Sequence, residues 1–77
     1  MDLRRIDDWS TLNGAKVEIH QQGNLVFAGT VDDVTDDGRI LWIHSAADGR
    51  RLFEKSQFYE VWAAEERIGF HYRMAVR

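Results

Sequence analysis

The acidic run DDVTDDG, residues 32–38, contains the residue types that could bind a metal ion. From Asp33 onward, Asp, Thr, Asp and Gly have the spacing of the first, third, fifth and sixth positions of an EF-hand calcium loop. The closing position would be His44, where such a loop needs a bidentate glutamate and a flanking helix. The flanking residues alternate as strands do, so we interpret the run as a solvated hairpin turn without a metal ion.

Histidine and serine are the other residue types here that commonly carry chemistry. His20, His44 and His71 are far apart in the sequence, and none has a partner at the spacing of a zinc site. No serine stands in a strand–turn–helix elbow with a base and an orienting acid. We therefore expect no catalytic residue, no cofactor and no metal site, and predict that the protein is not an enzyme.

Aromatic side chains are the most informative group, because they are concentrated in the second half of the chain. Trp42 and Trp62 lie in apolar stretches where their neighbours on the opposite phase suit a core, so both tryptophans are expected on an outer face. We predict a partner-binding face formed by Trp42, Tyr59 and Trp62. Arg50 and Arg51 would lie at its rim and pair with acidic groups of a protein partner. Core or subunit packing is the interpretation we prefer for these rings as a group, and the binding face is the functional hypothesis set beside it.

Charge and composition limit the classes of partner. The net charge is -3, with three basic and eight acidic side chains in residues 1–37 and seven basic and five acidic ones in residues 38–77. An acidic chain lacks the broad basic surface that nonspecific nucleic-acid binding needs. There is no cysteine and no apolar run near the length of a membrane span. We expect a cytoplasmic protein with no membrane partner.

The first element that must position these residues is predicted to be a short helix within residues 1–13. Leu3, Ile6 and Trp9 recur at spacings of three, which would place them on one helical face. Asp2 is the expected N-cap, and the helix should end before a glycine. We interpret its apolar stripe as a lid on one end of the core.

A period of two replaces the helical period from Ala15 onward and predicts short strands separated by turns. Gly23-Asn24 is the expected first hairpin turn, because both residues tolerate positive φ. Gly29 interrupts the apolar row of the second strand, as a glycine does where a sheet bends sharply or another backbone comes close. We predict a small five-stranded barrel over residues 14–63.

Two resemblances accompany this layout. The spacing of apolar residues and glycines resembles the first Sm motif of Sm and Sm-like RNA-binding proteins, which also begin with a short helix. It is carried by Leu12, Gly14, Val17, Ile19, Gly23, Gly29 and Val31. The layout is also similar to the C-terminal domain of biotin protein ligases, through Asp37, Gly38, Ile40, Leu41, Asp48 and Gly49. Both resemblances imply an SH3-like small β-barrel, and the first implies an RNA-binding ring.

The last segment, residues 66–76, has apolar residues on one phase and basic or small residues on the other. We predict an extra C-terminal strand here, which either extends the barrel sheet or pairs with the same strand of a second copy in a homodimer.

Residues 1–77 are thus expected to form one all-β domain, a five-stranded SH3-like barrel with an N-terminal helix and an added C-terminal strand. The predicted function is a non-enzymatic protein-interaction or assembly module of unknown pathway. The alternative is an Sm-like RNA-binding protein that forms a ring and contacts phosphates through Arg39, Arg50 and Arg51.

Overall fold

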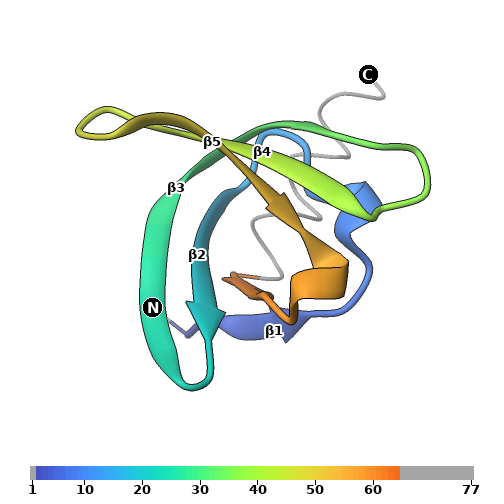
Figure 1. Ribbon diagram of the computed structural model, residues 1–77, viewed down its shortest axis with the longest axis horizontal. Coiled ribbons are helices and arrows are strands. Elements are labelled where there is room, and N and C mark those ends of the chain that lie inside the picture. Colours follow the sequence, from blue (N-terminus) through green and yellow to red (C-terminus); the bar gives the residue numbers. More distant parts are fainter. Residues whose placement is uncertain (1, 65–77) are drawn as a thin grey trace.

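The computed structural model describes residues 2–64 as one antiparallel sheet of six strands (Figure 1). The strands are β1 (Arg4–Ile6), β2 (Lys16–Gln21), β3 (Asn24–Val34), β4 (Ile40–Ser45), β5 (Gly49–Glu54) and β6 (Glu60–Ala63). Two short 3-10 turns, η1 (Trp9–Thr11) and η2 (Lys55–Gln57), connect strands. The strand order is β1-β6-β2-β3-β4-β5, so β6 lies between β1 and β2. The predicted all-β class is confirmed.

The predicted N-terminal helix is wrong. Residues 4–6 form β1, in which Arg4 is opposite Ala63 and Ile6 is opposite Val61 of β6. The chain then makes only the single turn η1, capped by Asp8, whose carboxylate accepts the backbone N–H of Ser10. A short segment has little intrinsic helical stability, so pairing with a distant strand outweighs a weak helical spacing.

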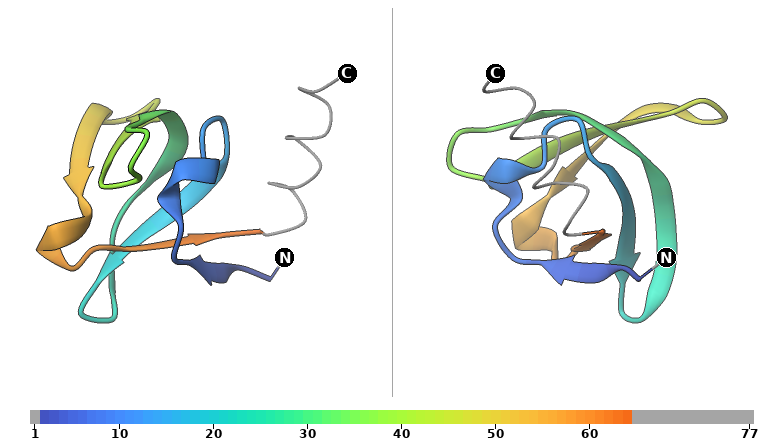
Figure 2. Two further views of the ribbon diagram at one scale, coloured as in Figure 1. Left: turned by 90° about the vertical axis from the view of Figure 1, so that its right-hand side faces the viewer. Right: turned by 180° about the vertical axis from the view of Figure 1, so that it is seen from behind.

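The closed five-stranded barrel is also wrong, because the sheet is open and has six strands in the described residues. It curls strongly, so that its inner faces surround one core, as the two views of Figure 2 show. Among the described strands, β1 pairs only with β6 and β5 pairs only with β4, which leaves both as edge strands. The predicted C-terminal strand, and the homodimer through it, lie outside the described residues.

Gly29 lies where β4 comes close to β3. A Cβ built at this position would clash with the backbone carbonyl oxygen of His44 and would lie 2.9 Å from Cγ2 of Ile43. Both residues belong to β4, so the missing side chain lets β4 approach β3 closely. The expected close approach of another backbone at this glycine is confirmed.

The β2–β3 hairpin forms where it was predicted, but its turn is one residue earlier. Gln21 pairs with Asn24, and the two loop residues are Gln22 and Gly23, with φ of 53° and 80°. Positive φ at both central residues matches the right-handed twist of the flanking strands.

The core is formed by alternate residues of the strands together with residues of the β1–β2 connection. Its buried members are Trp9, Leu12, Ala15, Val17, Ile19, Phe27, Val31, Leu41, Ile43, Phe53, Val61 and Ala63. Trp9 is 1% exposed, and the Lys55 ammonium lies 5.6 Å from its ring centroid. Although the helix is absent, Trp9 of the predicted apolar stripe is part of the core.

Candidate binding surfaces

The alternation of β4 and β6 sets which aromatic side chains remain accessible. Leu41, Ile43 and Val61 are fully buried, whereas Trp42 and Trp62 are half-buried on the outer face. The two tryptophans belong to strands that are separated by β2 and β3 in the sheet. The five residues predicted to form one binding face are therefore distributed over three places.

The first place is the outer face of β4 and β5, which we call the Trp42 surface (Trp42, Leu52, Arg50 and Asp32). Trp42 is directly opposite Leu52, whose side chain is 45% exposed. The Arg50 guanidinium carbon lies 5.5 Å from the centroid of the Trp42 ring, and Arg50 Nε donates to Asp32 Oδ2 at 2.6 Å. The ion pair holds the guanidinium over the indole and neutralises its charge, so this surface is mainly apolar.

The second place is the inner face of β5, where Arg51 covers aromatic residues of the core. Its guanidinium carbon lies 5.2 Å from the Phe27 ring and 5.0 Å from the Phe53 ring. Tyr59 contacts the same Phe53 ring edge-on, with centroids 5.0 Å apart. Arg51 has no ion pair with any residue of the described range 2–64, so its charge remains available to a partner.

The third place is a hollow of about 630 Å³ beside Trp62, which we call the Trp62 hollow. Its walls come from the N-terminal residues, β2, the β2–β3 turn and β6, and are formed by Asp2, Leu3, Glu18, His20, Gly23, Glu60 and Trp62. Trp62 Nε1 donates to Glu60 Oε1 at 3.2 Å, and the His20 ring centroid is 5.8 Å from that of Trp62. His20 Nε2 lies 2.9 Å from Glu18 Oε1. An aromatic wall is thus surrounded by carboxylates.

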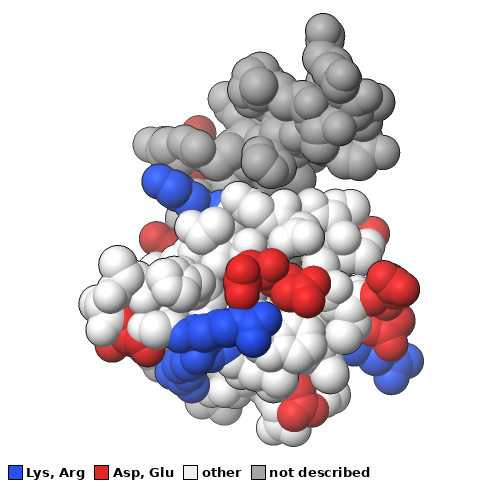
Figure 3. Space-filling model, turned by 90° about the horizontal axis from the view of Figure 1, so that it is seen from above, with Lys and Arg blue, Asp and Glu red and all other residues white. Residues whose placement is uncertain are grey.

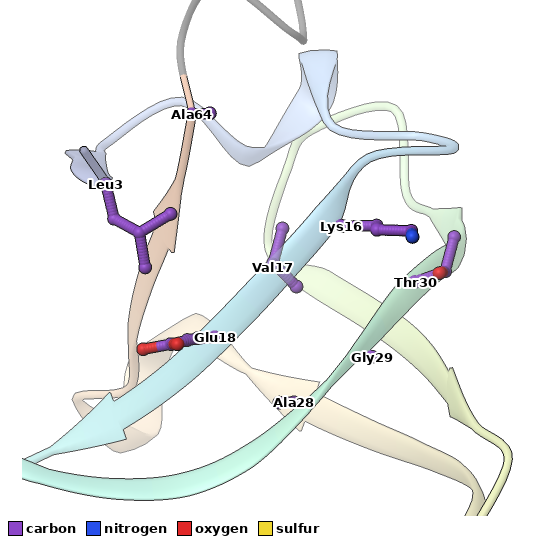
Figure 4. A pocket seen from close by; sticks show the side chains of 8 residues that line it. All are labelled: Leu3, Lys16, Val17, Glu18, Ala28, Gly29, Thr30 and Ala64. Atoms are coloured by element: carbon purple, nitrogen blue, oxygen red, sulfur yellow. The ribbon is translucent and has the colours of Figure 1, made fainter. Parts of the chain in front are cut away.

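A second hollow of about 480 Å³ adjoins it on the outer face of β2 and β3 (Figure 4). Leu3 and Glu18 line both hollows. Figure 4 shows Glu18 pointing toward Leu3, while Lys16 points toward Thr30. The remaining walls are small or apolar and supply no nucleophile, so the arrangement suits packing rather than catalysis.

Basic and acidic side chains lie next to one another on the face shown in Figure 3 rather than in separate regions. Arg39 follows the same pattern, with Nε 3.9 Å from Asp37 Oδ2. Carboxylates beside the arginines lower the attraction of these arginines for phosphate groups.

The acidic run at residues 32–38 covers the end of β3 and most of the β3–β4 turn. Asp37 Oδ1 accepts the Thr35 hydroxyl at 2.7 Å and the Arg39 backbone N–H at 3.1 Å, and these bonds lower the pKa of the Asp37 carboxyl below its ordinary value. Within residues 2–64, no group of three or more histidine and acidic side chains is placed to hold a metal ion. No helix in this range has the length and apolar character needed to cross a membrane.

Sequence reasoning missed three exposed apolar residues near the β2–β3 hairpin. Leu25 and Val26 are 58% and 37% exposed, and Phe58 is 84% exposed. Phe58 follows η2 directly, and its backbone is left-handed, with φ of 66°. The run Ser56-Gln57-Phe58 contains no glycine that would have signalled this conformation. The carboxylate wall of the Trp62 hollow was also missed, although Glu60 and Trp62 share one strand phase.

Comparisons of this chain with models of known protein families, with curated proteins and with solved structures give no match.

Proposed function

We propose that this chain is a non-enzymatic protein-interaction module that captures an extended segment of a partner on the free edge of β5. The observation that supports it best is the position of β5, a six-residue strand that pairs with β4 alone among the described strands. An edge strand presents unpaired backbone N–H and C=O groups, and a peptide can add to it as a further strand.

The side chains on the two faces of β5 define the chemistry of that segment. On the outer face, the exposed Leu52 lies against Trp42 and offers an apolar contact. On the inner face, Arg51 offers a positive charge that no described carboxylate neutralises. Since side chains of an added strand alternate between the faces, the best ligand has apolar residues on one phase and acidic residues on the other.

Arg50 contributes to this binding edge mainly through its position over the Trp42 ring. Its ion pair with Asp32 orders the guanidinium over Trp42, so it shapes the edge of the apolar contact instead of supplying a free charge. In this proposal, Trp42, Arg50 and Arg51 therefore act together at the strand pair β4–β5. Trp62 and Tyr59 do not take part in it.

Selection of peptides from a phage-displayed random library, followed by binding measurements with a synthetic selected peptide, tests the proposal. Leu52→Lys places a charge on the apolar contact and should weaken binding by about tenfold, equivalent to roughly 1.4 kcal/mol. Leu25→Lys is the matched control, because Leu25 is similarly exposed but lies on β3. Its affinity should stay within about twofold of the original, a change of roughly 0.4 kcal/mol.

Amide chemical shifts recorded during the same titration should change mainly in β4 and β5. Equal losses for the two lysine variants, or shift changes confined to other strands, would refute the proposed edge. If no peptide is selected while short single-stranded RNA binds with an affinity that falls steeply with salt, the RNA-binding alternative gains support.

A further inference from the structure

The Trp62 hollow and the second hollow, shown in Figure 4, adjoin along β2, and we call the two together the β2 recess. Leu3 and Glu18 line both parts of it. Leu3 and Trp62 are half-buried, so each leaves apolar surface accessible in the recess. Apolar surface gains stability when another group covers it. The recess is therefore suited to an occupant with apolar side chains.

The last described residue lies in the wall of this recess. Ala64 follows β6 directly, is 6% exposed and lines the second hollow. The sequence continues beyond Ala64 for at least thirteen residues. Even at the helical rise of about 1.5 Å per residue, a segment of this length reaches about 20 Å. The six residues of β2 span about the same distance. The segment that follows Ala64 thus starts at the recess and is long enough to cover it.

The composition of residues 65–77 suits such a surface. Large apolar residues occur at every second position, namely Ile68, Phe70, Tyr72, Met74 and Val76. Arginines lie among them or follow them, at Arg67, Arg73 and Arg77. Arginine has an apolar stem and a charged end, so it can pack beside an apolar contact and still reach a carboxylate at the rim.

The charge of the Trp62 hollow is complementary to these arginines. Asp2, Glu18 and Glu60 contribute carboxylates to its wall. Arg5 neutralises Glu60 only in part, because its guanidinium lies 3.7 Å from Glu60 Oε2 and is shared with Asp7 Oδ1 at 3.6 Å. The hollow therefore attracts further basic groups.

The order of charges along the chain also matches the recess. Lys16 lines the second hollow, where Ala64 lies, and two glutamates come directly after Ala64 in the sequence. The arginines come after these glutamates, and Asp2 and Glu60 line the Trp62 hollow. A chain that continues from the second hollow to the Trp62 hollow would meet opposite charge in both parts.

We propose that residues 65–77 fold back over β2 and occupy the β2 recess of the same chain. Their apolar side chains then contact Leu3 and Trp62, and their arginines pair with the carboxylates of the Trp62 hollow. This inference is independent of the β5 edge. It also differs from the expected C-terminal strand, because the segment covers a face of the sheet and adds to no edge.

A spin label on the full chain tests this inference. The chain has no cysteine, so Ala75→Cys provides a single position for a nitroxide. The label should remove most of the intensity of the Trp62 indole N–H signal in an NMR spectrum. The Trp42 indole signal is the internal control and should keep its intensity, because β2 and β3 separate the strands of the two tryptophans. Equal intensities for the two indole signals would overturn the inference.

Arginine variants of the labelled chain separate docking from simple proximity to Ala64. Replacing Arg67 and Arg73 together with glutamate should restore the Trp62 signal, because carboxylates would then face carboxylates. The matched control replaces the same two arginines with lysine and should keep the signal weak. These positions lie outside the described sheet, so the fold is not at risk. A Trp62 signal that stays equally weak with glutamate and lysine would show that the label is only tethered nearby, which refutes docking.

A mixture of two samples identifies the chain that supplies the segment. A spin-labelled chain without nitrogen-15 is added to an unlabelled chain with nitrogen-15, so that only broadening between copies is detected. The Trp62 signal should keep its intensity in this mixture. Its loss there would assign the occupant to a second copy and contradict docking within one chain.

Discussion

At the residue scale, two positions have backbone requirements that decide which side chain they accept. Gly29 lies where β4 approaches β3 so closely that a methyl group has no space. At position 58, by contrast, the backbone φ of 66° favours glycine, but the residue is a phenylalanine with a large ring. The first position is explained by the close approach of two strands, whereas the second combines a left-handed backbone with an exposed ring.

Gly29→Ala should destabilise the protein by about 1–3 kcal/mol, the range for overpacking a close contact. The added methyl group would have to displace the His44 carbonyl or the Ile43 side chain. Urea unfolding followed by tryptophan fluorescence gives the change in free energy of unfolding. Ala28→Ser, at the adjacent exposed position, is the control and should change it by less than about 0.5 kcal/mol. An equal effect of the two substitutions would show that β3 tolerates the extra group.

At the element scale, the β3–β4 turn is held by side-chain bonds as well as by its backbone. The Thr35 hydroxyl donates to Asp37, and the backbone N–H of Ile40 donates to the same hydroxyl at 3.1 Å. The strand alternation of the sequence identified this turn, but it did not reveal that the aspartate bonds to its own turn.

This turn should contribute a pH dependence to stability. Hydrogen bonds from Thr35 and from the Arg39 backbone lower the pKa of Asp37 below 3.8, so its stabilising effect is present above that pH and is lost as the pH falls through the lowered value. Asp37→Asn should therefore differ from the original protein at neutral pH and converge with it in strong acid. Urea midpoints measured over this pH range provide the test, with Asp36→Asn as the neighbouring control. A difference that stays constant with pH would exclude this carboxylate as the cause.

At the scale of the whole molecule, sequence periodicity predicted several of the buried residues, although not the exposure of Leu25, and it did not predict which strands are neighbours. Alternation correctly placed Val17, Ile19, Leu41, Ile43 and Val61 inside. It could not show that β6 lies between β1 and β2, because that pairing joins residues far apart in the chain. The sequence predicted one binding face with both Trp42 and Trp62, but the two residues lie apart because β2 and β3 separate their strands in the sheet.

Trp9 shows how much the whole core depends on a residue outside the sheet. It is 1% exposed and belongs to the shared core cluster. Trp9→Ala should cost about 3–5 kcal/mol, a large part of the total stability of a domain this small. Thermal unfolding by circular dichroism gives the loss, and Ser10→Ala tests whether any change in η1 has the same effect. A loss below about 1 kcal/mol would mean that the surrounding side chains collapse into the space.

The position of β6 also has a consequence for the order in which the chain folds. Strands β2, β3, β4 and β5 are successive hairpin partners, so they can associate through contacts that are local in sequence. Strand β1 has to wait, because its only described partner is the last described strand. Closing so long a stretch of chain is entropically costly and typically slows folding. We expect β1 to join the sheet in the final kinetic step, after β6 has docked on β2.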